Sequence, residues 1–245
     1  MEAFHLVFLR ALAARAEDKS LVALKGGCNL RFYFGSIRYS EDIDFDVVTI
    51  APGTLKNRVE RLLAGPLVVS PLRSIGIEIA ETSAPKQTAT TQRWKLGLRV
   101  HAASVLVRTK IEFSRRDAIS GATFDATPRG TTRTHGLPPV LATHYGLRAA
   151  IAQKIHALHG RAEPQARDVF DLAHLFTKGD QTFAPRPEES AWLPNAIDHA
   201  LGISYDEYRS KVVGFLEPEL AAPFESALAW QEMQERVVSE LEGLR

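Results

Sequence analysis

The sequence predicts an α+β fold, with a mixed sheet and flanking helices in the first half of the chain and helices alone in the second. Three observations indicate this division. Short apolar runs bounded by turn residues recur up to about residue 119, residues 120–139 are rich in Gly, Thr and Pro, and the remainder shows helical periodicity. The 245 residues, of which 45% are hydrophobic, can bury the cores of two such parts. We therefore expect a first domain over residues 1–135 and a helical domain over residues 136–245.

The elements of the first domain follow from the spacing of apolar and turn residues. Phe4, Phe8 and Leu12 repeat at helical spacing near the start of the chain, and Pro52 opens a later helix, since proline is favoured in a first helical turn. In order, we expect a helix at 2–17, a strand at 21–24, a helix at 28–34, a strand at 43–48, a helix at 52–64, strands at 75–79, 94–100 and 105–113, and a polar connection at 83–92.

The second domain is expected to contain only helices. The apolar periodicity places them at 144–160, 166–177, 188–201, 204–214 and 218–242. The N-terminal apolar stretch is interrupted by Arg10 and Arg15, so it indicates an amphipathic helix rather than a signal peptide or a membrane span. We expect a cytoplasmic protein with no membrane partner.

Charge and cysteine content exclude several classes of protein. The net charge is only +1, so nucleic-acid binding would have to come from a local patch, and the single cysteine, Cys28, excludes a disulfide framework and a cysteine-based zinc site. Nine basic and three acidic residues give residues 93–133 a net charge of +6, whereas five basic and twelve acidic residues give residues 186–245 a net charge of −7. The basic stretch suits a polyanion, or its side chains protect exposed strands from pairing; both interpretations stay open.

The segment Asp42-Ile-Asp-Phe-Asp-Val47 combines a carboxylate row with an apolar row. Successive side chains of a strand point to opposite faces, so Asp42, Asp44 and Asp46 share one face. Aspartate is depleted in strands, and Mg²⁺ is commonly held by one or two carboxylates together with substrate phosphates. We therefore predict that Asp42 and Asp44 bind Mg²⁺ or Mn²⁺, although a polar strand face is also ordinary at a sheet surface.

A glycine pair, Gly26-Gly27, precedes this strand by about fifteen residues and follows an apolar run that ends at Lys25. Glycine lets the backbone approach a phosphate closely, and the start of a following helix offers free N–H groups to an anion. The predicted nucleotide-binding residues are Lys25, Gly26, Gly27, Arg31, Arg38 and Ser40. Arg31 could instead brace the acidic strand, and Ser40 could also silence the site if it were phosphorylated.

Together, the segments LKGGCNLRF and RYSEDIDFDV resemble the AbiEii/AbiGii abortive-infection toxins of type IV toxin–antitoxin systems, within the polymerase β-like nucleotidyltransferase superfamily. The resemblance implies a minimal nucleotidyltransferase domain followed by a helical domain that completes the active-site cleft. It implies transfer of a nucleoside monophosphate from an NTP to an acceptor hydroxyl, with the 3′ end of a tRNA as the acceptor, growth arrest as the result, and a cognate antitoxin as a partner.

Two later segments, AQKIHAL and ARDVFDLA, are similar to further motifs of that family. By this resemblance Lys154 is the active-site lysine, Asp168 is the later acidic residue, and Asp171 is an additional candidate. The alternative is a salt bridge between two helices. In TKIEFS, Glu112 is the best position for a third metal carboxylate, against the alternative of an ordinary Lys–Glu surface pair.

Two other functions stay open at this point. A kinase-like enzyme of the same fold would move the γ-phosphate to a protein hydroxyl. A non-catalytic partner or nucleotide-sensing module would keep the pocket without turnover, although the intact Asp42 and Asp44 pair favours catalysis.

Overall fold

The computed structural model describes residues 1–14, 19–101, 106–179 and 183–245, and the described chain divides into two compact units. The first unit comprises residues 1–33 and 40–145, and the second comprises residues 34–39 and 146–245. Residues 15–17 of the predicted first helix and residue 105 of a predicted strand lie outside the described residues.

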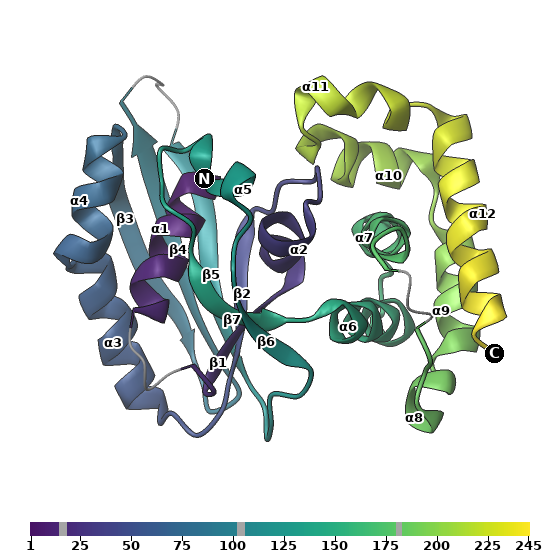
Figure 1. Ribbon diagram of the computed structural model, residues 1–245, viewed down its shortest axis with the longest axis horizontal. Helices are drawn as coiled ribbons and strands as arrows, with labels where there is room; N and C mark the ends of the chain where they lie inside the picture. Colours follow the sequence, from purple (N-terminus) through teal and green to yellow (C-terminus); the bar gives the residue numbers. More distant parts are fainter. Residues whose placement is uncertain (15–18, 102–105, 180–182) are drawn as a thin grey trace. The chain divides into compact units, whose positions relative to one another are not determined.

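The first unit is built on a mixed seven-stranded sheet with the order β3-β4-β5-β2-β1-β7-β6 (Figure 1). The pairs β2/β5 and β1/β7 are parallel, and the other neighbouring pairs are antiparallel. The strands are β1 (Val22–Lys25), β2 (Asp42–Val47), β3 (Ile77–Gln87), β4 (Thr91–Val100), β5 (Leu106–Arg115), β6 (Ala122–Ala126) and β7 (Leu141–Tyr145). The helices that begin in this unit are α1 (Glu2–Ala13), α2 (Gly26–Phe34), α3 (Pro52–Ala64), α4 (Pro66–Ser74) and α5 (Arg129–Arg133).

The apolar row of β2 lies in the core of the first unit. Ile43, Phe45 and Val47 are buried, and Phe45 stacks on Phe113 of β5 with ring centroids 4.9 Å apart. Helices α1, α3 and α4 contribute apolar side chains to the same cluster. Burying one such side chain stabilises the fold by about 1.5–3 kcal/mol, and a slip of one residue would move the carboxylates into the core. The core therefore fixes which face carries Asp42 and Asp44.

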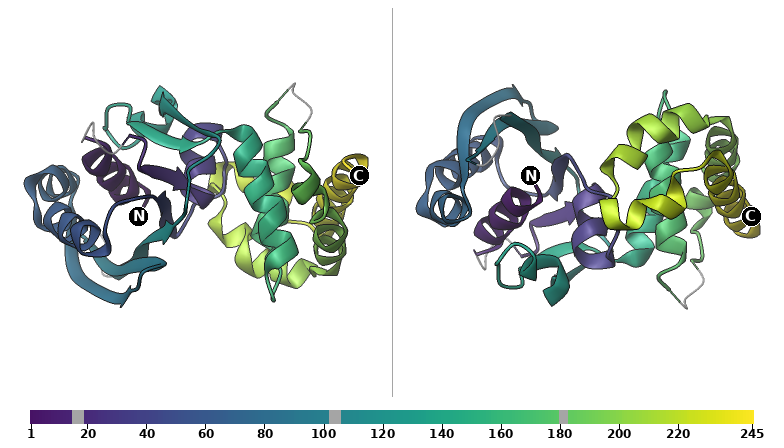
Figure 2. Two further views of the ribbon diagram at one scale, coloured as in Figure 1. Left: turned by 90° about the horizontal axis from the view of Figure 1, so that it is seen from below. Right: turned by 90° about the horizontal axis from the view of Figure 1, so that it is seen from above.

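The second unit is helical and is shown from two further directions in Figure 2. Its helices are α6 (Leu147–Gly160), α7 (Ala166–Phe176), α8 (Pro187–Ser190), α9 (Leu193–Gly202), α10 (Tyr205–Lys211), α11 (Pro218–Ala221) and α12 (Ala227–Gly243), with 3-10 turns η2 (Val213–Phe215) and η3 (Ala222–Phe224). Helices α6, α7, α9 and α12 pack against one another, and Tyr208 of α10 stacks on Trp230 of α12 with centroids 4.4 Å apart. The Ser226 hydroxyl caps α12 by accepting from the Ala229 N–H, so the predicted helix at 218–242 is interrupted there.

The α+β prediction is confirmed, with local corrections. The polar connection expected at 83–92 is a β-hairpin, because β3 runs to Gln87 and β4 begins at Thr91. The outer part of β3 is an exposed edge, so its residues carry no alternating apolar pattern. Residues 120–139, expected to be a loop, contain β6 and α5.

The boundary between the two parts also differs from the one expected between residues 135 and 136. Strand β7 pairs in parallel with β1, with Leu24 beside His144, so the first unit extends to Tyr145. Residues 34–39 belong to the second unit: the Tyr39 N–H donates to the Phe215 carbonyl at 2.8 Å, and the Glu217 N–H donates to the Ile37 carbonyl at 2.9 Å. Among the described residues, no helix combines the length and hydrophobicity that crossing a membrane requires.

Candidate active site

The carboxylate row of β2 meets charged side chains on both neighbouring strands. In the register of the sheet, Asp44 lies beside Lys25 of β1 on one side and beside Glu112 of β5 on the other, while Asp42 lies beside Lys110. Side chains that are directly opposite in a sheet lie close enough to interact. The alternation predicted for Asp42, Asp44 and Asp46 is therefore present, and with Glu112 it gathers four carboxylates and two lysines on one face.

Asp46 is engaged within the protein fold. Its carboxylate accepts from the Lys25 ammonium at 2.6 Å and from the Tyr145 hydroxyl at 2.8 Å, and the Arg116 Nε lies 3.3 Å away. Burial, together with the nearby Asp46 charge, raises the pKa of Tyr145, so this hydroxyl stays protonated as a donor. Asp46 therefore holds β2 to its neighbours, and Lys25 is committed to Asp46 rather than to Asp44.

Asp44 differs from its neighbours because no ion pair to it is present in the described chain. Asp42 pairs with Lys110 at 2.7 Å and Glu112 pairs with Arg93 at 2.6 Å. Burial, reinforced by the charges of Asp42 and Glu112 and opposed by Lys25 and Lys110, raises the pKa of Asp44 to about 6. Burial is thus the main reason why ionisation of Asp44 is unfavourable, and the two neighbouring carboxylates add to it.

The glycine turn lies directly against Asp44. Gly26 is the first residue of α2 and has a φ of +70°, a conformation that is costly for other residues. A Cβ atom at this position would stand 3.0 Å from the Asp44 Oδ2. Both the backbone conformation and the contact therefore require glycine. The arrangement places the N-terminal amides of α2, which lack helical partners, beside the acidic row.

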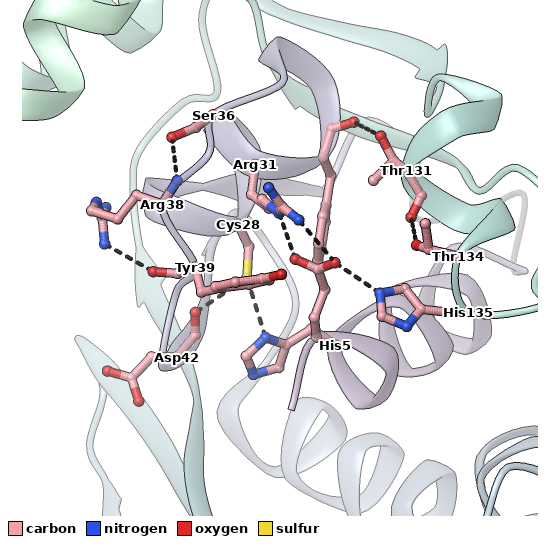
Figure 3. A network of polar contacts seen from close by, with 12 residues as sticks. His5, Cys28, Arg31, Ser36, Arg38, Tyr39, Asp42, Thr131, Thr134 and His135 are labelled. Carbon is pink, nitrogen blue, oxygen red and sulfur yellow. Dashed lines mark hydrogen bonds and ion pairs between the residues drawn. The ribbon is translucent and has the colours of Figure 1, made fainter. Parts of the chain in front are cut away.

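Polar contacts hold the backbone that carries Asp42, and Figure 3 shows Cys28 and Asp42 among the residues involved. The Cys28 thiol donates to the Asp42 carbonyl at 3.3 Å, and the Ser40 hydroxyl donates to the same carbonyl at 2.9 Å. The Thr109 hydroxyl donates to the Glu41 carbonyl at 2.7 Å. Ser40, predicted as a phosphate contact, is thus engaged with the backbone of the acidic strand.

A buried histidine joins two of these groups. The His5 Nε2 lies 2.8 Å from the Thr109 Oγ1, and its Nδ1 lies 3.4 Å from the Cys28 sulfur. Burial lowers the pKa of His5 to about 3, so the imidazole is neutral at physiological pH. Because the Thr109 proton is donated to Glu41, the His5 proton resides on Nε2, and the unprotonated Nδ1 lies beside the Cys28 sulfur. Burial raises the pKa of Cys28, which therefore remains a thiol.

Arg31 forms an ion pair within the first unit. Its Nε donates to the Glu2 carboxylate at 2.6 Å, and the His135 Nε2 lies 2.7 Å from the other Glu2 oxygen (Figure 3). Burial would raise the pKa of Glu2, but the contacts with His135 and Arg31 hold it below the ordinary value. Arg31 therefore braces α2 against α1 rather than against the acidic strand.

Arg38, Lys154 and Asp168 lie in the second unit, in a network of buried charges. Arg38 donates to both Asp171 oxygens, at 3.0 and 2.9 Å. The Lys154 Nζ lies 2.8 Å from Asp168 and 2.7 Å from Asp171, and the Arg161 Nε lies 3.0 Å from Asp168. Both aspartates are fully buried.

Electrostatics support the ionised form of this network. Burial alone would lower the pKa of Lys154, but the carboxylates of Asp168 and Asp171 outweigh it and raise that pKa. Burial would likewise raise the pKa of Asp171, yet Arg38 and Lys154 hold it well below the ordinary value. The salt bridge that is the alternative interpretation of Lys154 and Asp168 is thus present in the structure.

The structure places the predicted residues in three groups. Lys25, Gly26, Gly27, Ser40, Asp42, Asp44 and Glu112 gather around the start of β2; Arg31 pairs with Glu2; and Arg38, Lys154 and Asp168 form the network of the second unit. The sequence predictions missed the roles of His5, Thr109 and Tyr145. These residues lie far from β2 along the chain: the strand order brings Thr109 and Tyr145 near it, and His5 reaches Thr109 from α1.

Some features of the site suit a divalent cation. No group of three or more His, Cys, Asp or Glu side chains in the described ranges is arranged to hold a metal ion by itself. A cation at this face would therefore need oxygens from a substrate besides those of Asp42 and Asp44. This sharing is usual for Mg²⁺, and a cation beside Asp44 would favour its ionised form, which burial and the nearby carboxylates disfavour.

Comparisons with solved structures show proteins of similar fold. The fold resembles JHP933 from Helicobacter pylori (TM-score 0.61, 21% identity, covering 97% of this chain and 90% of the other) and a candidate nucleotidyltransferase from H. pylori (0.63, 21%, 98% and 93%). It also resembles MenT4, a nucleotidyltransferase toxin from Mycobacterium tuberculosis (0.56, 16%, 99% and 90%). No curated protein sequence matches significantly.

The family comparison covers almost the whole chain. Residues 7–243 match the model of the nucleotidyl transferase AbiEii toxin of type IV toxin–antitoxin systems. The matched range contains the glycine turn and β2 in the first unit as well as Lys154 and Asp168 in the second. The resemblance read from Gly26-Gly27 and the acidic strand is thereby confirmed: this chain belongs to the AbiEii family of nucleotidyltransferase toxins.

Proposed function

We propose that this toxin transfers a nucleoside monophosphate from an NTP to the 3′-terminal hydroxyl of a tRNA and so blocks translation and growth. The observation that supports this most is the contact between the glycine turn and the acidic strand. Gly26 lies so close to Asp44 that the amides at the start of α2 and the carboxylates of β2 address one substrate position. Amides suit the phosphates of an NTP, and carboxylates suit the cation that accompanies them.

The proposed reaction asks for positioning rather than covalent chemistry. The acceptor oxygen forms a bond to the α-phosphorus while the bond from that phosphorus to the β-phosphate oxygen breaks. Pyrophosphate leaves, and the hydroxyl proton passes to solvent. Asp42 and Asp44 would hold Mg²⁺ or Mn²⁺, which when bound activates the acceptor hydroxyl and neutralises the leaving phosphate. We retain Glu112, opposite Asp44 in the register, as a third ligand that would have to exchange its contact with Arg93.

The phosphate-binding assignments are refined by the ion pairs. Arg31 and Arg38 already pair with Glu2 and Asp171, and Lys25 pairs with Asp46. We therefore propose that the Gly26 and Gly27 amides make the principal phosphate contacts, with Lys25 as a nearby charge. Lys154 and Asp168 are proposed to be needed for activity because of their place in the family motifs.

Family membership implies an NTP substrate and a cognate antitoxin. The proposed tRNA acceptor adds a location: NTPs and tRNA meet in the cytoplasm, so we place the reaction there.

Labelled nucleotides test the proposed reaction directly. We would incubate the protein with total tRNA, Mg²⁺ and each NTP in turn, labelled at the α- or the γ-phosphate, with Asp44→Ala as the inactive control. We expect α-label on the RNA with the wild type and none with the variant. Phosphoryl transfer of γ-label to protein would indicate a kinase instead, and absence of turnover with every NTP would indicate a non-catalytic module.

A further inference from the structure

A cavity of about 630 Å³ opens beside Asp42 on the side of β2 away from the glycine turn. It extends over β5, β4 and β3, and its lining includes Asp42, Lys110, Lys95 and Ser83. Asp42 is paired with Lys110, Lys110 with Lys95, and Lys95 with Ser83, each on the next strand of the sheet. Residues paired in this way lie on one face of the sheet. The cavity is therefore a direct continuation of the carboxylate row.

The position of the cavity matches the direction from which an acceptor must attack. In phosphoryl transfer the attacking and leaving oxygens lie roughly in line through the reacting phosphorus. The glycine turn follows β1, whereas the cavity lies over β5, β4 and β3, on the opposite side of β2. If the leaving phosphates occupy the turn at Gly26, in-line attack would bring the hydroxyl from the side of β2 on which the cavity lies.

The lining is polar and contains both donors and acceptors. Lys95 is exposed, and within the described part of the chain it forms no ion pair. Arg108 pairs with Glu81 across the cavity, and the hydroxyls of Thr82 and Ser83 lie on the β3 side. Three basic and three acidic residues line the cavity, so it provides no strong positive field. Such a lining suits a ligand that both donates and accepts hydrogen bonds. The part of the ligand inside the cavity should carry few charges.

A ribose joined to one phosphate has these properties. Its hydroxyls donate to carboxylates, and its phosphate accepts from lysine and arginine. The described residues that line the cavity include no aromatic ring, so a platform for stacking a base is missing. The chemistry therefore favours recognition of an RNA backbone over recognition of a base sequence.

We propose that this cavity binds the ribose-phosphate backbone next to the accepting end of an RNA, with Lys95 as its phosphate contact and without reading the bases. The assignment rests on the proposed nucleotidyl transfer and adds how the acceptor is recognised. Because Lys95 is exposed and forms none of the ion pairs around Asp42, its replacement leaves the carboxylate row intact.

The test measures the acceptor and the nucleotide separately. We would determine KM for a synthetic RNA with a tRNA 3′ end and KM for the NTP, using the wild type, Lys95→Gln, Lys95→Arg and Arg99→Gln. Arg99 lies on the same strand and pairs with Glu78, but it does not line the cavity, so it is the matched control. We expect Lys95→Gln to raise the acceptor KM about tenfold, the scale of one charge-assisted hydrogen bond, with the NTP KM unchanged. Lys95→Arg should restore most of the loss.

Modified acceptors test the claim about the backbone. Near the 3′ end, removal of a base should change the acceptor KM less than about threefold, whereas a 2′-deoxy or an uncharged phosphate substitution should raise it about tenfold. An unchanged acceptor KM in Lys95→Gln, a rise in the NTP KM instead, or a greater loss from base removal than from backbone substitution would each overturn the assignment. Absence of any label transfer by the wild type would instead refute the proposed function itself.

Discussion

The ionised form of Asp44 is the one proposed to bind a metal ion, but it lowers the stability of the folded protein. Its pKa is raised to about 6 by burial and by the charges of Asp42 and Glu112. An acid whose pKa is higher in the folded state than in the unfolded state favours folding below its unfolded pKa and loses that contribution as the pH rises through the folded value. At neutral pH the ionised Asp44 therefore destabilises the metal-free protein.

We predict that Asp44→Asn stabilises the protein by about 1–3 kcal/mol at pH 8 in the presence of EDTA. This is the free energy that corresponds to raising the pKa of Asp44 from its ordinary value to about 6. The gain should shrink to near zero at pH 4, where the wild-type carboxyl is protonated as well. Denaturant unfolding at the two pH values measures this difference. Glu60→Gln, in an exposed pair with Lys56, is the control and should change stability by less than about 0.5 kcal/mol. A variant less stable than the wild type at pH 8 would contradict the account.

At the scale of elements, residues 34–39 between α2 and β2 belong to the second unit. Residues 34–39 bond to the backbone around Phe215 and Glu217, and Arg38 makes two hydrogen bonds to the buried Asp171. Asp42 follows this anchored segment by three residues. Arg38 thus holds residues 34–39 within the second unit, and its role as a phosphate contact stays a prediction.

We predict that Arg38→Gln destabilises the protein by about 3–5 kcal/mol, because it leaves Asp171 buried with one of its two cations removed. Asp171→Asn should cost a similar amount, and the double variant should cost less than the sum of the two. Since the pKa of Asp171 is held below its ordinary value, its contribution is present above about pH 4 and is lost in acid. Urea unfolding monitors each variant, with the exposed Arg209→Gln as the control. Equal stabilities of Arg38→Gln and Arg209→Gln would show that the pair does not anchor the segment.

For the whole molecule, the sequence predicted those features that depend on local patterns. Alternation along residues 42–47 gave both faces of β2, and the glycine pair gave the start of α2, because each depends only on neighbouring residues. The family follows from the same two segments, and the match over residues 7–243 confirms it. The metal-binding and nucleotide-binding roles of these residues stay predictions.

Other features depend on contacts between residues distant in the chain, which no local pattern reveals. Strand β7 is short, and its last residues fall within the helix predicted at 144–160. Only its pairing with β1 identifies it as a strand. The pairings of Arg31 with Glu2 and of Arg38 with Asp171 join residues 29 and 133 positions apart. The sequence shows the charges of both arginines but not these partners, and their predicted phosphate contacts stay predictions.

The central claim is that Asp42 and Asp44 together hold a divalent cation beside the glycine turn. Electron paramagnetic resonance of Mn²⁺ in the presence of a non-hydrolysable NTP analogue tests it most directly. We expect the wild type and Glu60→Gln to bind Mn²⁺ alike, and Asp42→Asn and Asp44→Asn each to weaken binding by at least about tenfold, since each removes one charged ligand. Undiminished Mn²⁺ binding by both aspartate variants, folded and tested under the same conditions, would contradict it.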